Sequence, residues 1–265
     1  MSSIVVSELE YGPPGADQLF FDVSFKVSPG EHAAIVGANG VGKSTILRIL
    51  TQEIEADGGE FAIGGTMLNM TQDVGMSRPN DTLREMLVEV APKHLRTAGR
   101  ALIAAEKALA DGTDDGMGYA TALGDWGDLG GYELESDWQA AAQRSVKTPV
   151  DDFSRRLVSE LSGGERKRLV LDLLLTSGAD VLLLDEPTAG LDPVARTDLL
   201  HELRLFLAVH PNAAVVYATH LLDELRSINP DRLLVLHNGA LQEFDRADTR
   251  AFDVDVLTAI MTGAT

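Results

Sequence analysis

One stretch constrains this chain more than any other, the segment GANGVGKST at residues 37–45. It matches the pattern G-x-x-x-x-G-K-[ST], and it lies between a short apolar run at 33–36 and a helical pattern of apolar residues at 46–50. A strand, a glycine-rich turn and a helix in this order are the context that a phosphate-binding loop requires. The glycines let backbone N–H groups turn towards phosphate oxygens, and the start of the helix adds about half a positive charge. The sequence therefore predicts a phosphate-binding loop.

The polar side chains of this loop have separate predicted roles. Lys43 is expected to reach the β- and γ-phosphates of a nucleotide, and Ser44 is expected to hold Mg²⁺. The residues expected to contact the nucleotide are Gly37, Asn39, Gly40, Gly42, Lys43, Ser44 and Thr45. The alternative is a glycine-rich turn that binds nothing, but chance gives only on the order of 0.01 matches to the pattern in a chain of this length.

The composition is that of a folded, acidic protein. With 265 residues, 45% of them hydrophobic, the chain can form one large α/β domain, or one domain with an inserted subdomain. Its 22 Lys and Arg against 41 Asp and Glu give a net charge of −19. This charge argues against broad binding to nucleic acids or to anionic lipids.

The expected location follows from residue patterns that are missing. The chain has no cysteine, and residues 1–10 lack the basic and long apolar regions of a secretory signal. No uninterrupted apolar run reaches the roughly 18 residues that a membrane span needs. We expect a cytoplasmic chain that reaches the inner face of a membrane only through a partner.

Tyr11 lies in a β-rich opening. Residues 4–6 and 19–27 are predicted strands, with a turn at 12–15 between them. Tyr11 comes just before this turn, where its ring can stack on an adenine or pack as an ordinary half-buried aromatic residue. Its place upstream of the phosphate-binding loop favours stacking.

Gln72 follows the apolar run at residues 67–70. An amide at the end of a strand can reach Mg²⁺ or an attacking water, or it can simply face solvent. Both interpretations stay open from the residues alone.

Residues from about 79 to 160 contain few candidate strands and many Ala, Leu and Glu, so they predict an inserted helical lobe. Thr82 and Glu85 form a capping box that opens a helix through Val90, and residues 96–110 predict a second helix.

The charge of this lobe changes sign along the chain. Residues 91–110 contain four basic residues and one acid: Lys93, Arg96, Arg100, Lys107 and Glu106. Residues 111–137 contain no Lys or Arg and eight acids: Asp111, Asp114, Asp115, Asp125, Asp128, Glu133, Glu135 and Asp137. We expect a solvated helix face followed by an acidic loop. Residues 111–116 superficially resemble a calcium-binding loop but lack the later Glu, so no metal is predicted there.

A second S-x-x-E box, Ser162 with Glu165, predicts the start of another helix. Gly163 and Gly164 leave the N–H groups of its first turn accessible, so this helix start can also bind an anion. A chain with two such helix starts can hold one nucleotide between two copies, although the box can equally do no more than start a helix.

Two adjacent carboxylates end the apolar strand predicted at residues 181–184. Buried carboxylates cost several kcal/mol unless they are paired or used. Asp185 suits Mg²⁺, held jointly with Ser44. Glu186 suits a general base that polarises the water attacking a γ-phosphate. The alternative is a solvated pair at the end of a strand.

His220 ends the buried strand predicted at residues 213–218, after Thr219. A lone histidine is usually structural, but parallel α/β sheets gather ligands at this edge, so His220 is a candidate sensor of the γ-phosphate. Residues 233–237 and 241–244 then predict a hairpin about Asn238 and Gly239. The tail from residue 247 gives no structural signal.

Together these segments resemble an ATP-binding cassette (ABC) ATPase, over roughly residues 4–245. The resemblance assigns the aromatic A-loop to Tyr11, Walker A to 37–45, the Q-loop to Gln72, the signature to 161–165, Walker B to 181–186, the D-loop to 189–192 and the switch histidine to His220. It implies one α/β cassette over 1–265, a P-loop core of parallel sheet with an antiparallel β portion, and a helical subdomain inserted at about 73–160.

The resemblance also implies the ligands and the assembly. ATP and Mg²⁺ are the expected cofactors, with Glu186, His220 and Gln72 catalytic, and with Ser44, Gln72 and Asp185 at the metal. Cassettes of this family work as head-to-tail dimers, so Ser162, Gly163, Gly164 and Asp192 are expected at a nucleotide site of the dimer. The second cassette can be another copy or a different cassette, including one in tandem.

The branch of the family is divided between two patterns. The separation of Gln72 from Leu161, and the segment at 126–132, are similar to the first cassette of ABC-F proteins, soluble ribosome-associated ATPases. The segments DEPTAGLDP at 185–193 and THLLDE at 219–224 are similar to transporter cassettes. We expect the ATP-binding subunit of a membrane permease ahead of an ABC-F-like partner of the ribosome. A third class, a binding module that does not hydrolyse ATP, is disfavoured because Glu186 and His220 are both present.

Overall fold

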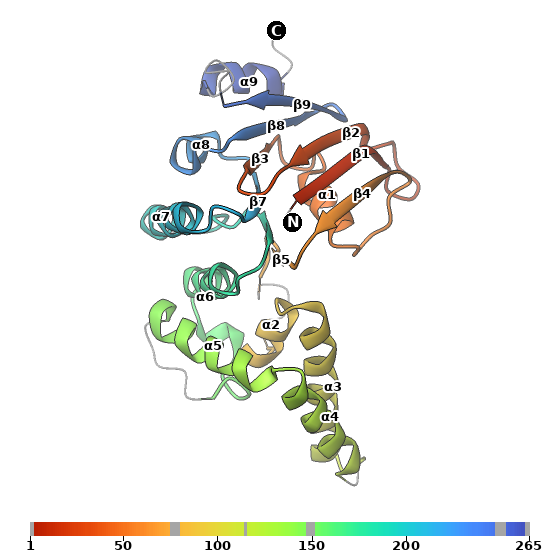
Figure 1. Cartoon of the computed structure of the whole chain (residues 1–265), viewed down its shortest axis with the longest axis vertical. Coiled ribbons are helices and arrows are strands. Elements are labelled where there is room, and N and C mark those ends of the chain that lie inside the picture. Colours follow the sequence, from red (N-terminus) through yellow and green to blue (C-terminus); the bar gives the residue numbers. More distant parts are fainter. Residues whose placement is uncertain (1–2, 75–79, 114–115, 147–151, 247–252, 263–265) are drawn as a thin grey trace. The chain divides into compact units, whose positions relative to one another are not determined.

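A six-stranded sheet carries the predicted phosphate-binding loop (Figure 1). The structure, a computed structural model, describes residues 3–74, 80–113, 116–146, 152–246 and 253–262. They form two compact units, one of Met1–Gln72 with Gly178–Thr265 and the other of Asp73–Ser177.

The six-stranded sheet has the order β5-β6-β7-β3-β8-β9. Its strands are β3 (His32–Val36), β5 (Met67–Met70), β6 (Val181–Asp185), β7 (Ala214–Thr219), β8 (Arg232–His237) and β9 (Ala240–Asp245). Neighbours from β5 to β8 are parallel, and β9 is antiparallel to β8. Every residue of β6 and β7 is buried, as expected for parallel strands that are covered on both faces.

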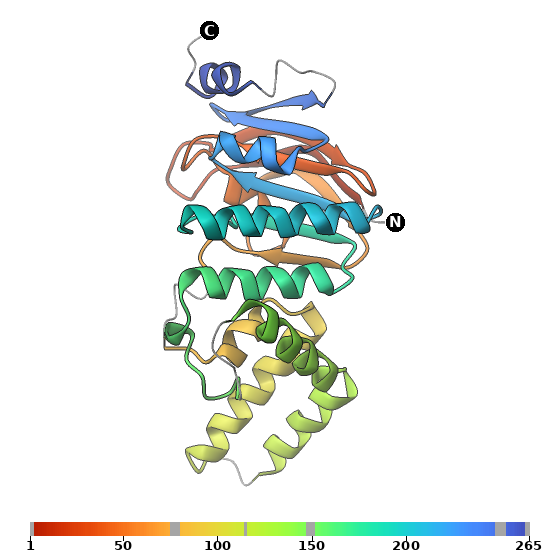
Figure 2. The ribbon, with the colours of Figure 1, turned by 90° about the vertical axis from the view of Figure 1, so that its left-hand side faces the viewer.

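Helices cover both faces of this sheet. In Figures 1 and 2, α7 (Pro193–Val209) and α8 (Leu222–Ile228) lie along one face, and α1 (Lys43–Leu50) lies on the other. On the face of α1, a three-stranded antiparallel sheet has the order β2-β1-β4, with β1 (Ser3–Tyr11), β2 (Phe20–Val27) and β4 (Gly58–Gly64). Apolar side chains of both sheets and of α1 form one core, which holds the start of α1 in place.

The predicted hairpin is present between β8 and β9. Asn238 and Gly239 have φ of 48° and 78°, the positive values that a tight turn of this kind requires. Sequence analysis missed the later helix α9 (Val254–Thr262), which packs on the same sheet. Its Leu257 is fully buried with Leu225, Leu233 and Val235.

The second unit is helical. Its elements are α2 (Leu83–Glu89), α3 (Lys93–Ala110), α4 (Met117–Asp128), α5 (Gly131–Ser145), the short 3₁₀ helix η1 (Val158–Glu160) and α6 (Gly163–Thr176). Both predicted capping boxes form, at Thr82 and at Ser162. Helix α3 begins three residues before the predicted Arg96. The unit also includes α6, beyond the boundary near 160 expected for the insertion, whose limits remain a prediction.

The prediction of an acidic loop at 111–137 is wrong for most of its length. Helices α4 and α5 occupy it, each starting at a glycine with positive φ, Gly116 and Gly130. Their stability comes from a buried stripe that charge counting overlooks: Trp126 and Trp138 are each 1% exposed, with ring centroids 6.2 Å apart. Asp114 and Asp115 lie outside the described residues.

Candidate functional site

The register of the parallel strands brings the predicted site residues to one edge of the sheet. Val36 of β3 pairs with Thr219 of β7, and Asp185 of β6 pairs with Ala218. Met70 of β5 pairs with Leu184. The chain therefore leaves each strand at the same edge, the position where open parallel sheets bind ligands.

The loop before α1 has the backbone of an anion-binding turn. Gly40 and Gly42 have φ of 80° and 115°, and Gly42 is the N-cap of α1. A Cβ on Gly42 would lie 2.9 Å from the ring of Phe20, so any other residue here would force that ring to shift. Helix geometry leaves the first N–H groups of α1 without acceptors inside the helix, and these groups can bind phosphate oxygens.

Lys43 is buried at the start of α1. Its Nζ donates to the carbonyl oxygens of Gly37 at 2.9 Å and Ala38 at 3.1 Å, and it lies 3.5 Å from Oε1 of Glu186. Burial lowers the pKa of Lys43, while the carboxylates of Glu186 and Asp185 oppose that shift.

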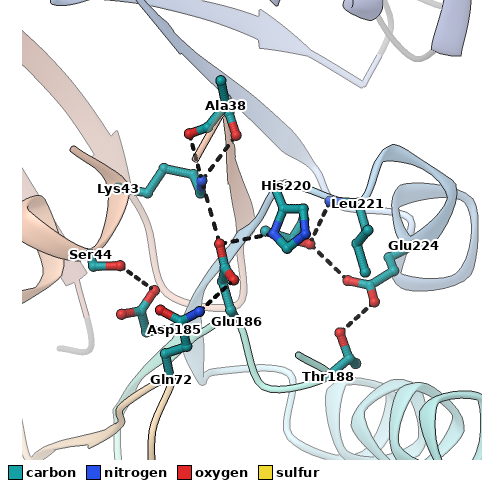
Figure 3. Close-up of polar contacts among 12 residues, drawn as sticks. Ala38, Lys43, Ser44, Gln72, Asp185, Glu186, Thr188, His220, Leu221 and Glu224 are labelled. Atoms are coloured by element: carbon teal, nitrogen blue, oxygen red, sulfur yellow. Dashed lines mark hydrogen bonds and ion pairs between the residues drawn. The ribbon is translucent and has the colours of Figure 1, made fainter. Parts of the chain in front are cut away.

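Glu186 lies at the centre of a polar cluster (Figure 3). Its Oε1 is 3.0 Å from Nδ1 of His220, and its Oε2 accepts a hydrogen bond of 3.0 Å from Nε2 of Gln72. Its backbone is left-handed, with φ of 43°, and its N–H donates to the carbonyl of Ala218 at 2.9 Å. This conformation is uncommon outside glycine and typical of functional positions.

Ser44 and Asp185 form the pair predicted for Mg²⁺. The Ser44 hydroxyl donates to Oδ1 of Asp185 at 3.0 Å. Within the described residues no group of three or more His, Cys, Asp and Glu is arranged to hold a metal. Mg²⁺ does not need one, since it is usually bound by one or two protein ligands, waters and substrate phosphates. A hydroxyl and a carboxylate beside a phosphate-binding loop fit that requirement.

A pocket of about 290 Å³ lies beside these groups. It is lined by Asn39, Gly40, Gly42, Lys43, Ser44, Thr45, Gln72 and Glu186. Gly37 and His220 adjoin it through their contacts with Lys43 and Glu186. Most residues predicted for this half of the site are thus brought together.

Tyr11 is not among the residues that line this pocket. Its ring packs against Phe20, with centroids 6.2 Å apart, and Phe20 is the neighbour of Gly42 described above. Tyr11 is half-buried, so one part of its ring packs on the core and the other part stays accessible.

The remaining predicted residues lie at two other helix starts. Ser162 caps α6 in the helical unit, where Gly163 and Gly164 form the first turn. Asp192 caps α7, and its Oδ1 accepts from the N–H groups of Val194 and Ala195, both at 3.0 Å. Ser162 and Asp192 therefore each have a structural role, as the N-cap of a helix.

A buried group behind the site was missed by sequence analysis. Glu224, four residues after His220 on α8, accepts hydrogen bonds from the hydroxyls of Thr188, Tyr217 and Thr219. An acidic residue in the first turn of a helix is ordinary. Only the tertiary fold reveals that this one is buried.

The family model described as "ABC transporter" matches residues 20–189. The chain belongs to the ABC transporter family. A relative described as "Antibiotic resistance protein" from Mycobacteroides abscessus is 34% identical over 254 residues, which are 93% of this chain and 46% of that protein. The chain thus spans less than half of that relative.

Another relative, "Hemin import ATP-binding protein HmuV" from Methylobacillus flagellatus, is 32% identical over 241 residues, 89% of this chain and 81% of that protein. A solved structure, "Structure of ATP binding subunit of ABC transporter", matches with a TM-score of 0.66 at 22% identity, over 98% of this chain and 99% of that chain. These findings confirm the predicted family and the α/β P-loop fold class.

None of the helices in the described ranges has both the length and the apolar character needed to cross a membrane.

Proposed function

We propose that this chain binds Mg-ATP at the pocket beside α1 and hydrolyses it to ADP and phosphate, as one cassette of a pair. The observation that carries the proposal is the cluster in which Glu186 contacts Lys43, His220 and Gln72 next to the pair of Ser44 and Asp185. Family membership supports ATP as the nucleotide.

Each residue of the cluster has a role in the proposal. Lys43 and the N–H groups at the start of α1 bind the β- and γ-phosphates. Glu186 accepts the proton of the attacking water. Gln72 holds one carboxylate oxygen of Glu186 by a hydrogen bond, and His220 lies beside the other. Ser44 and Asp185 hold Mg²⁺, which neutralises phosphate charge when bound. Tyr11 stacks on the adenine.

Four further residues are proposed to act across a pair of cassettes. Ser162, Gly163 and Gly164 form the start of α6, where backbone N–H groups can face an anion. Asp192 caps α7 with its own carboxylate. We propose that they close the site of the partner cassette. The partner cassette is a second copy of this chain or a different cassette.

Hydrolysis is tested by replacing Glu186 with Gln. Turnover of Mg-ATP should fall by about 10²-fold or more, because the amide cannot take the proton, while ATP binding persists. The matched control is Glu60→Gln, at an exposed position of β4 in the same unit. Near-normal turnover in Glu186→Gln would remove Glu186 as the base.

The proposed partner that ATP hydrolysis drives is a membrane permease. This partner would place the chain at the inner face of a membrane. The similarity of this chain to the import protein HmuV, over most of the length of HmuV, supports a permease partner. A second candidate is an ABC-F-like role on the ribosome, favoured by the resistance relative that is about twice as long as the match.

Two of the basic residues of α3 already have partners within the chain, which argues against a role on the ribosome. Contact with RNA relies on free Lys and Arg. Arg100 is already paired with Glu89, and Arg96 donates to the carbonyl of Ala91. Lys93 is exposed at the start of this helix.

Fractionation of cells expressing Glu186→Gln separates the two candidates. The variant should sediment with membrane proteins. Recovery with ribosomes, released by high salt and lost when Lys93, Arg96 and Arg100 are replaced by Ala, would instead establish the ABC-F-like role.

A further inference from the structure

The carboxylate of Glu224 is the best-buried charge in the described part of the α/β unit. Its side chain is 0% exposed. The hydroxyl of Tyr217 donates to its Oε2 at 2.6 Å and that of Thr219 at 2.9 Å, while Thr188 donates to Oε1. Nε of Arg196 lies 3.7 Å from Oε1. Several elements are thus joined through one side chain.

The donors explain how a buried carboxylate is tolerated. Removing a carboxylate from water is unfavourable unless hydrogen bonds and an opposite charge replace the lost hydration. Burial, together with the charge of Glu224, raises the pKa of Tyr217 well above its usual value, so the phenol stays protonated and donates. Three hydroxyl donors therefore replace much of the hydration that the carboxylate loses.

The donors stand beside the residues proposed for catalysis. Thr188 follows Glu186 by two positions, and Thr219 directly precedes His220. The Thr219 hydroxyl also accepts from the N–H of Leu221 at 3.0 Å, so both neighbours of His220 are held.

The turn after Glu186 needs such an anchor. Glu186 is held at φ of 43°, a left-handed region that is strained for a residue other than glycine. The N–H of Ala189 donates to the carbonyl of Glu186 at 3.0 Å, which closes the turn that contains Thr188. Without the bond from Thr188 to Glu224, this turn can relax towards ordinary φ and swing the Glu186 carboxylate away from His220.

We infer that Glu224 is a positioning residue, which fixes Glu186 and His220 relative to one another by holding Thr188 and Thr219. This inference rests on the proposed hydrolytic function. The competing interpretation is that Glu224 contributes to folding alone, in which case all of its donors should be equivalent.

Three hydroxyl deletions distinguish these interpretations. Thr188→Val and Thr219→Val keep the side-chain shape and remove one anchor each, so kcat should fall by about 10- to 100-fold. The dissociation constant for ATP should stay within about twofold, because Lys43 and Ser44 lie on α1. Thr188→Ser and Thr219→Ser restore the hydroxyl and should recover kcat.

Tyr217→Phe is the matched control. It removes a hydrogen bond to the same oxygen of Glu224 as Thr219→Val does. Its backbone, however, lies inside β7, paired with Leu184 and Ala34 on both sides. We expect wild-type kcat from Tyr217→Phe, even if it lowers thermal stability as much as the threonine variants do.

A second readout does not depend on hydrolysis. The imidazole NMR signals of His220, assigned with His220→Asn, should shift in both threonine-to-valine variants and stay unchanged in Tyr217→Phe. If wild type fails to hydrolyse ATP, the proposed function falls, and these signals still decide the positioning role. Equal changes in all three deletions, or no change in any, would overturn it.

Discussion

At the scale of single residues, the ion pair of Lys43 and Glu186 governs how a nucleotide can enter. The two side chains are only 3% and 7% exposed, and their charged atoms are 3.5 Å apart. A phosphate that approaches Lys43 therefore competes with the carboxylate of Glu186. Phosphate binding must therefore rearrange the ion pair, because the ammonium group of Lys43 already has a partner.

Replacing Lys43 by Ala should weaken ATP binding itself. The change removes a charge-assisted contact worth about 1.5–3 kcal/mol, so the dissociation constant should rise by about 10- to 100-fold in equilibrium titrations. Lys26→Ala, at an exposed position of β2, is the control for loss of one positive charge. An unchanged dissociation constant in Lys43→Ala would contradict the assignment.

His32 should make folding stability depend on pH. It begins β3 with Nδ1 3.1 Å from Oδ2 of Asp231, and its buried Nε2 has no hydrogen-bond partner among the described residues. Burial lowers the pKa of His32, against the opposing charge of Asp231. The unfolded chain then takes up the proton first, so stability is full above about pH 6.5 and is lost as the pH falls through the lower folded-state pKa.

Urea unfolding at about pH 7.5 and about pH 5.5 tests this. Wild type should lose more stability between the two values than His32→Gln, which cannot take up the proton. Because the many carboxylates titrate in both proteins, only the difference between them reports on His32. Equal losses would rule out a role for this histidine.

Gln72, Glu186 and His220 were predictable because each lies within two residues of the end of an apolar strand. Parallel strands bring such positions to one sheet edge, which is how Gln72, Glu186 and His220 meet. Glu224 was not predictable, because nothing in THLLDE tells which acid turns inward.

At the scale of elements, capping explains where the helices of the second unit begin. At Thr82 the N–H and hydroxyl contact Oε2 of Glu85, while the N–H of Glu85 donates back to the Thr82 hydroxyl. Such local motifs are readable from sequence. The helices α4 and α5 could not be predicted in this way, because their glycine and acid content is typical of a loop. Their buried contact between Trp126 and Trp138 is visible only in the folded structure.

Removing the cap at Thr82 should destabilise the helical unit. Thr82→Ala loses the side-chain acceptor for the N–H of Glu85, at a cost of about 1 kcal/mol. Thr82→Ser keeps the hydroxyl and should stay within a few tenths of wild type. The comparison is made by urea unfolding, and equal stability of all three proteins would show that the cap is not needed.

At the scale of the whole molecule, two helix starts suited to anions occur in one chain, at Gly42 and at Ser162. They lie in different compact units. One nucleotide can therefore be shared between two cassettes, with each copy offering one helix start to each site.

ATP should join two copies of Glu186→Gln. We expect size-exclusion chromatography to give a dimer with Mg-ATP and a monomer without it, at tens of micromolar protein. Adding Ser162→Arg should block the dimer by filling the second helix start. A chain that remains monomeric with Mg-ATP would mean that a different cassette is its partner.

The chain contains two tryptophans, and both belong to the helical unit, buried beside one another. Tryptophan fluorescence therefore reports on the helical unit alone, whereas far-ultraviolet circular dichroism reports on the backbone of both units. An unlabelled sample carries its own optical reporter for the unit that has no phosphate-binding loop. We expect a change in that emission when ATP binds, and a change that persists in a chain kept monomeric would show that the helical unit responds to the loop of the other unit.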